Sequence, residues 1–156
     1  MNPLLTVGLP TYNRSKVVGE SISQILNQSF RDFELIIFND GSTDNTISEI
    51  SKFNDNRIIF INSINLGPPH PLNHIIKEAK GKYIIILHDH DFFDKFLLED
   101  SINFLESNPH IGFVLQGSAW INEDGVSGYK EMLLDLPLLN NGKKNAIQIL
   151  QNKKNM

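Results

Sequence analysis

The strongest constraint on the fold is the alternation of short apolar runs with segments of helical periodicity. The runs LIIF, RIIFI and YIIIL are almost continuously apolar, which is typical of parallel strands that are covered on both faces. Between the runs, apolar residues recur every three or four positions, as on one face of a helix. The pattern predicts an α/β protein, a three-layer α/β/α sandwich with a mainly parallel central sheet.

The expected elements follow each other in strict alternation along the chain. Strands are predicted at 4–9, 34–38, 58–61, 83–87 and 111–115. Helices are predicted at 16–28, 44–53 and 94–107, with a further helical stripe over 72–79. After Trp120 the alternation weakens, and we expect a polar loop over 122–128 and a short basic helix near the end.

Composition excludes several classes of protein. The 156 residues suit a single folded domain, and the net charge of -4 argues against a nucleic-acid-binding protein. The absence of cysteine excludes disulfides, thiolate zinc sites and a cysteine nucleophile. No apolar run approaches the roughly 20 residues of a transmembrane segment, and no signal peptide is recognisable. We therefore expect a cytoplasmic protein, with the inner face of the membrane as the alternative for a longer form.

Polar sequences follow each of the first four predicted strands. They are PTYNRS, NDGSTD, NSINLGPP and HDHD. In an open parallel sheet, ligands bind outside the carboxyl ends of the strands, so these four segments should converge on one edge. This convergence is stronger evidence for a site than any single motif.

The segment NDGSTD has two interpretations. As a turn, Gly41 supplies the backbone geometry and Ser42, Thr43 or Asp44 caps the following helix. The turn explains Asp40 less well, because a carboxylate at a strand end can also accept hydrogen bonds from a nucleotide base or ribose.

The segment HDHD also has two interpretations. It is a solvated strand end before a helix, which suits Asp94, or it is a cation site. Two close carboxylates, Asp89 and Asp91, repel each other unless a cation lies between them, and such pairs bind Mg2+ or Mn2+. His90 is a third candidate ligand. The sequence lacks a dinucleotide fingerprint, a P-loop and a nucleophile elbow.

Four stretches in this order resemble family 2 glycosyltransferases, which have the GT-A fold and use nucleotide-diphosphate sugars. The stretches are VGLPTYNRS, FELIIFNDGSTDNT, NLGPPHPLNHIIKEAKGKYIIILHDHD and LLEDSINFLESNP, and the resemblance covers about residues 5 to 125. It implies that residues 1–125 form a nucleotide-sugar-binding domain and that residues 126–156 begin an acceptor-side region that is truncated.

The resemblance implies a role for each matching position. The nucleotide pocket would be lined by Pro10, Tyr12 near the base, and Asn13. Asp40 would contact the base or ribose, and Asn65 and Gly67 would shape the adjoining loop. A motif formed by three residues would hold Mn2+ or Mg2+ against the diphosphate: Asp89, His90 and Asp91.

The implied reaction is an inverting transfer from a nucleotide-sugar donor, with a UDP-sugar expected, to a hydroxyl of a saccharide or lipid-linked acceptor. The cation would neutralise the leaving diphosphate, and a carboxylate would accept the proton. None of the later acids, Glu123, Asp124, Glu131 and Asp135, is assigned as that base. Oligomeric state is not predicted.

Three positions depart from the family pattern. Asn39 stands where an acid is usual, Leu72 where an arginine is usual, and His90 where the metal motif usually has aspartate. These departures favour the main alternative, a degenerate module that binds a nucleotide sugar without catalysis. A nucleotidyltransferase would need a basic, glycine-rich loop after the first strand, and a receiver domain would need paired acids there, and PTYNRS provides neither.

Overall fold

The computed structural model describes residues 2–114, 118–122 and 125–130. The chain divides into two compact units, residues 1–99 and residues 100–156. Within the described residues, no helix has the length and apolar character needed to cross a membrane.

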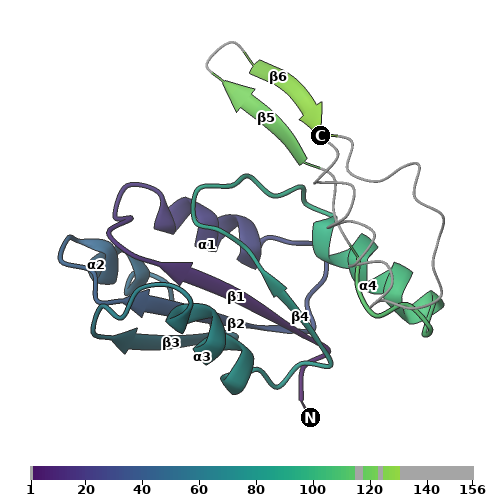
Figure 1. The fold of residues 1–156 in the computed structure, drawn as a ribbon, viewed down its shortest axis with the longest axis horizontal. Coiled ribbons are helices and arrows are strands. Elements are labelled where there is room, and N and C mark those ends of the chain that lie inside the picture. The colour runs from purple at the N-terminus through teal and green to yellow at the C-terminus, as the bar shows by residue number, and fades with distance from the viewer. Residues whose placement is uncertain (1, 115–117, 123–124, 131–156) are drawn as a thin grey trace. The chain divides into compact units, whose positions relative to one another are not determined.

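The first unit holds a four-stranded parallel sheet with its helices (Figure 1). Its strands are β1 (Leu5–Thr11), β2 (Phe33–Asp40), β3 (Ile58–Ser63) and β4 (Tyr83–Ile86), and its helices are α1 (Val18–Leu26), α2 (Thr46–Ile50) and α3 (His70–Glu78). Helix α4 (Leu97–Ser107) begins at the end of this unit. These elements confirm the first four predicted strands and the helices between them, with each helix shorter than predicted except the third.

The strand order is β3-β2-β1-β4, and every neighbouring pair is parallel. Helices α1 and α3 lie on opposite faces of the sheet (Figure 1). The chain therefore builds outward from β1 to β3 and then returns through α3 to add β4 on the other side of β1. The direction of winding reverses between β1 and β4, which makes this point the topological switch where open α/β sheets bind ligands.

The core consists of alternate residues of the strands packed against these helices. On the α3 face, Ile36, Phe38 and Ile75 form a buried cluster, with partly buried isoleucines from β3 and β4 around it. The intervening strand residues are buried on the α1 face, where Val18, Ile22 and Ile25 of α1 are also fully buried. All eight residues of β2 are buried, as expected for a central strand.

A hydrogen-bond network fixes the entry to β4. The buried Thr6 hydroxyl donates to Glu34 Oε1 at 2.6 Å, and the same oxygen accepts from the Lys80 amide at 2.6 Å. The Gly81 amide donates to Thr6 Oγ1 at 2.9 Å. These bonds satisfy polar groups that burial would otherwise penalise, and they bring the start of β4 directly beside β1.

The second unit differs from the predictions in two respects. Residues 111–114 form no strand, so the predicted strand at 111–115 is wrong over its described part; Leu115 lies outside the described residues. The Ile111 amide instead donates to Asn108 O in a turn after α4. The antiparallel strands β5 (Ser118–Asn122) and β6 (Gly125–Lys130) pair with each other where a polar loop was predicted. The predicted basic helix near the end lies outside the described residues.

Replacing Gly81 with alanine should destabilise the first unit. A Cβ atom there would lie 2.4 Å from Thr6 N and 2.6 Å from Leu5 C, and backbone atoms cannot move aside without breaking the β1–β4 pairing. We expect a loss of about 1–3 kcal/mol in the free energy of unfolding, measured by denaturant titration.

Gly19→Ala is the matched control, because the nearest atom to its Cβ is 3.9 Å away and the position lies in α1. This variant should be neutral or more stable by up to about 1 kcal/mol. Equal losses in the two variants would contradict the role given to the close approach at Gly81.

Candidate functional site

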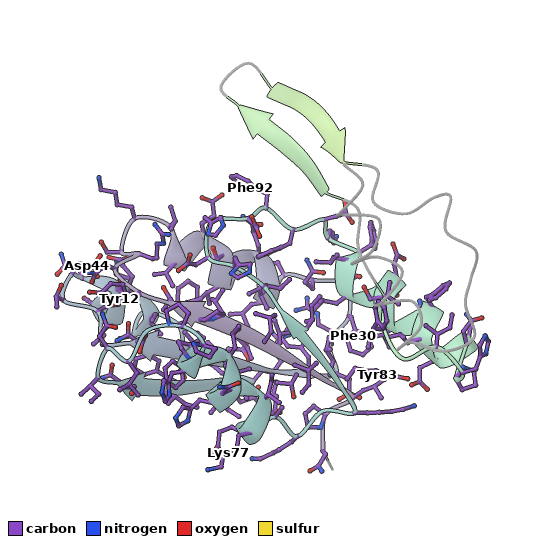
Figure 2. The ribbon with its side chains drawn as sticks, viewed as in Figure 1. Tyr12, Phe30, Asp44, Lys77, Tyr83 and Phe92 are labelled. Atoms are coloured by element: carbon purple, nitrogen blue, oxygen red, sulfur yellow. The ribbon has the colours of Figure 1, made fainter. Side chains whose placement is uncertain are left out.

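The carboxyl ends of the strands carry the candidate site. Figure 2 shows Tyr12 and Asp44 together at this edge and Tyr83 toward the opposite end of the sheet. Three loops leave this edge in the first unit, after β1, β2 and β3, and the segment after β4 joins them. The four polar segments predicted from the sequence therefore start from one edge, as expected.

Asp89 lies at the switch point with its side chain turned into the protein. Its Oδ2 accepts a hydrogen bond of 2.7 Å from the Thr11 hydroxyl at the end of β1, and its Oδ1 lies 3.3 Å from Arg14 Nε. The side chain of Asp89 is 6% exposed and that of Arg14 is 50% exposed. The ion pair thus joins a buried carboxylate to a cation that still reaches solvent.

Helix α1 holds the segment after β4 through one polar stripe. Ser21 Oγ donates to the backbone oxygen of Asp89 at 3.0 Å, and Gln24 Oε1 accepts from the Phe93 amide at 2.9 Å. One helical turn further, Gln28 Nε2 donates to Asp94 O at 2.7 Å. Residues 90–92 lie between these anchors, so they are displayed at the edge by a segment that is fixed on both sides.

His90 and Asp91 lie in the displayed part. Their side chains are 59% and 53% exposed, and His90 Nε2 lies 3.8 Å from Asp91 Oδ1. The rings of His88 and His90 stack with their centroids 5.6 Å apart, which orients the His90 ring. Phe92 beside them is also exposed.

The three residues predicted to bind a metal therefore separate into two kinds. Among the described residues, no group of three or more histidine and acidic side chains is arranged to hold a metal ion. His90 and Asp91 fit two positions in a Mn2+ shell, because imidazole and carboxylate are both accepted ligands and waters or phosphates can complete the shell. The contacts of Asp89 with Thr11 and Arg14 instead favour an internal role.

The loops after β1 and β2 are joined by three sets of hydrogen bonds. The Asn13 amide donates to Ser42 Oγ at 2.9 Å, and Asn13 Oδ1 accepts from the Thr43 amide at 2.7 Å. The Arg14 amide donates to Thr46 Oγ1 at 2.8 Å. The positive φ of 53° at Asn13, a conformation that asparagine tolerates better than most residues, turns the chain into this contact.

Asp44 supplies the third connection. Its Oδ1 accepts from the Thr46 hydroxyl and from the Thr46 amide at 2.9 Å, and its Oδ2 accepts from the Ser15 amide at 3.1 Å. These bonds, that from the Thr46 hydroxyl first, hold the pKa of Asp44 below its ordinary value of 3.8. Asp44 thus meets the first amide of α2, close to the capping role predicted for NDGSTD.

Asp40 holds the loop after β3. Its Oδ1 accepts from the Leu66 amide and its Oδ2 from the Gly67 amide, each at 2.9 Å. A Cβ atom at Gly41 would lie 2.4 Å from Asn65 N, so glycine allows this loop to approach the end of β2. Asp40 is buried, and its carboxylate fixes the loop that carries Asn65 and Gly67.

The remaining predicted residues lie at the same edge. Pro10 is near the end of β1 and half-buried, whereas Tyr12, just beyond it, is 44% exposed. Asn65 is exposed, and Gly67 has a positive φ of 69°. The structure therefore brings the predicted nucleotide-pocket residues to the same edge as His90 and Asp91, while their ligand contacts stay a prediction.

Sequence reasoning missed Arg14, Thr11 and the function of Asn39. Asn39 is fully buried; its Nδ2 donates to Asn62 Oδ1 at 2.7 Å and its Oδ1 accepts from the Ser42 hydroxyl. An uncharged amide suits this buried position because it both donates and accepts. The interleaving of Thr, Arg and Asp between distant segments gives no local sequence signal.

Comparison with known proteins identifies relatives of this chain. The family model described as "Glycosyl transferase family 2" matches residues 6–154. An uncharacterized glycosyltransferase of Rickettsia bellii is 38% identical over 131 residues, which cover 83% of this chain and 18% of that protein. The chain thus spans less than a fifth of the length of this relative.

Two solved structures share the fold. The S. aureus TarS 1–349 structure in complex with UDP-GlcNAc has a TM-score of 0.63 and 27% identity, covering 70% of this chain and 32% of that one. A mannosyltransferase of Pyrobaculum calidifontis in complex with GDP-Man and Mn2+ has a TM-score of 0.65, covering 72% and 34%. At 23% identity, this second likeness concerns the fold alone. The parallel sheet and these neighbours confirm the predicted GT-A fold.

Asp89 and Asp91 should differ in their effect on stability. Asp89→Ala removes the acceptor of the Thr11 hydroxyl and the partner of Arg14, so we expect a loss of about 1–3 kcal/mol in the free energy of unfolding. Asp91→Ala should stay within about 0.5 kcal/mol of the wild type, because this side chain is exposed. Denaturant titration of both variants checks this, and equal stabilities would refute the internal role of Asp89.

Asp44 should contribute to acid sensitivity. Because its pKa is lower in the folded than in the unfolded chain, its contribution to stability is complete above the unfolded value and declines as the pH falls toward the folded value. The free energy of unfolding of the wild type should therefore fall more steeply below about pH 4 than that of Asp44→Asn. Parallel pH profiles of the two proteins would rule out this contribution.

Proposed function

The chain belongs to glycosyl transferase family 2, and we propose that it forms the nucleotide-sugar-binding part of a glycosyltransferase. The observation that carries the proposal is the convergence of the interlocked loops after β1 and β2, the Asp40-bound loop and the segment after β4 on one sheet edge. That edge includes the switch point where a nucleotide would bind.

The proposed donor is a UDP-sugar. The relative TarS is named a poly(ribitol-phosphate) beta-N-acetylglucosaminyltransferase, and its structure in complex with UDP-GlcNAc supports this choice of nucleotide. Tyr12 offers an exposed ring for the base, and the loop held by Asp40 offers Asn65 and the Gly67 backbone to the nucleoside. Pro10 and Asn13 would complete the pocket from the β1 side.

The proposed reaction is an inverting transfer to a hydroxyl of a saccharide or lipid-linked acceptor. The acceptor oxygen forms a bond to the anomeric carbon, the bond from that carbon to the diphosphate oxygen breaks, and a carboxylate base accepts the hydroxyl proton. A divalent ion, Mn2+ or Mg2+, would supply charge neutralisation for the leaving diphosphate. His90 and Asp91 are the side chains that would hold it, and Asp89 would fix the segment that presents them.

We place the division of labour along the chain as follows. Residues 1–125 bind the donor, and residues 126–156 begin the acceptor side, which a longer protein would complete together with the base. The proposed location is the cytoplasm, where nucleotide sugars are available.

A degenerate binding module is the second candidate. It is favoured by the engagement of Asp89 with Arg14 and by the absence of a three-residue metal cluster among the described residues. Such a module would still bind the nucleotide but would not require a divalent ion. Metal dependence of binding therefore separates the two candidates.

Calorimetric titration of the chain with UDP tests the proposal, first with Mn2+ and then with EDTA. We expect binding with Mn2+ that weakens in EDTA, and Asp91→Asn should weaken the Mn2+-dependent binding at least about tenfold, because it removes a charged metal ligand. Asp94→Asn is the control, since Asp94 caps the chain before α4 through the Phe96 amide and an amide can still accept that bond.

Equal affinity in Mn2+ and EDTA would support the degenerate module. Unchanged Mn2+-dependent binding by Asp91→Asn would refute Asp91 as a ligand. If UDP does not bind, GDP and dTDP follow, and failure of all three would refute the proposed nucleotide site.

A further inference from the structure

The carboxyl edge of the sheet is rich in carboxylates, which poses a problem for an anionic ligand. Asp40, Asp44, Asp89 and Asp91 all lie in the segments that leave this edge. A nucleoside diphosphate is a polyanion and would be repelled by these groups unless positive charge is present beside them. The question is which group of the chain supplies that charge.

The cations of the first unit are distributed unevenly. Arg31 and Arg57 precede β2 and β3, and Lys80 and Lys82 precede β4, so these side chains belong to the amino ends of the strands. Lys95 has also left the carboxyl edge, because its backbone oxygen accepts from Ser29 N after α1. In the described segments that adjoin the carboxyl ends, the cations are Arg14 and Lys16.

Of these two, Arg14 is held at the switch point. Its Nε lies 3.3 Å from Asp89 Oδ1, and its amide donates to Thr46 Oγ1. The neighbours on either side are also fixed, Asn13 by Ser42 and Thr43 and Ser15 by Asp44. The backbone that carries Arg14 is therefore anchored at three consecutive residues before any ligand arrives.

The side chain of Arg14 has capacity for an anion. The contact with Asp89 involves Nε, and half of the side chain is exposed. A guanidinium presents five N–H donors in a planar fork that matches phosphate geometry, and it stays protonated at all working pH values. Asp89 thus aims the fork through one nitrogen, and the two terminal nitrogens face the edge where His90 and Asp91 are displayed.

We propose that Arg14, aimed by Asp89, is the residue that binds the diphosphate of the donor through its terminal nitrogens. The inference rests on the proposed function and adds to it a positive group supplied by the chain itself. It also assigns the buried acid of the HDHD segment a positioning role, because Asp89 touches Arg14 rather than the ligand.

The test compares UDP with uridine, which lacks the diphosphate, in NMR titrations of the chain with Mg2+ present. Arg14→Gln should raise the Kd of UDP about ten- to hundredfold, the effect of losing charge-assisted hydrogen bonds, and leave the Kd of uridine unchanged. Lys16→Gln is the matched control, two residues away on the same loop and also exposed, and its Kd for UDP should change less than about threefold.

Three results would overturn the assignment while leaving the proposed function intact. They are wild-type UDP affinity in Arg14→Gln, an equal loss of UDP and uridine binding, and a loss in Lys16→Gln as large as in Arg14→Gln. If Arg14→Gln does not fold, Arg14→Lys takes its place: it keeps the charge beside Asp89 but loses the fork, and wild-type UDP affinity in this variant also overturns the assignment.

Failure of the proposed function gives a different result. A wild-type chain that binds none of UDP, GDP and dTDP refutes both the proposed function and this inference. If GDP or dTDP binds in place of UDP, that nucleotide and its nucleoside replace UDP and uridine in the comparison.

Discussion

The burial of the Asp89 carboxylate is the constraint on which the carboxyl edge depends. A buried charge is tolerated only with partners, and here they come from two other parts of the first unit: the Thr11 hydroxyl from β1 and Arg14 from the loop after it. Ser21 of α1 binds the backbone oxygen of the same residue. One acid therefore connects the end of β4 with β1, with the following loop and with α1.

The other end of β4 is fixed by a second buried acid. Glu34 on β2 accepts from the Thr6 hydroxyl and from the Lys80 amide, and Gly81 donates to Thr6. Because β4 is only four residues long, anchors at both ends determine its position beside β1 more strongly than its own ladder does. The switch point is thus preorganised by the fold, which lowers the entropy that a ligand would have to offset.

Continuous apolar runs were sufficient to predict the parallel sheet because both of its faces are covered, and β2 shows this most clearly. The same reasoning failed at residues 111–114, since an apolar run becomes a strand only when another strand pairs with it. The β5–β6 hairpin was missed although Asp124-Gly125 is a sequence typical of hairpin turns. Polar composition was given more weight there than the turn signal.

At the edge of the sheet, the sequence predicted which segments meet but not which way each acid points. Asp89 and Asp91 are two residues apart and look equivalent in HDHD, yet the turn between His88 and Asp91 sends one inward and leaves the other exposed. Their difference is decided by Thr11 and Arg14, which lie more than 70 residues earlier in the chain. The function of an acid in such a motif therefore depends on its partners across the switch point, and a short motif cannot encode them.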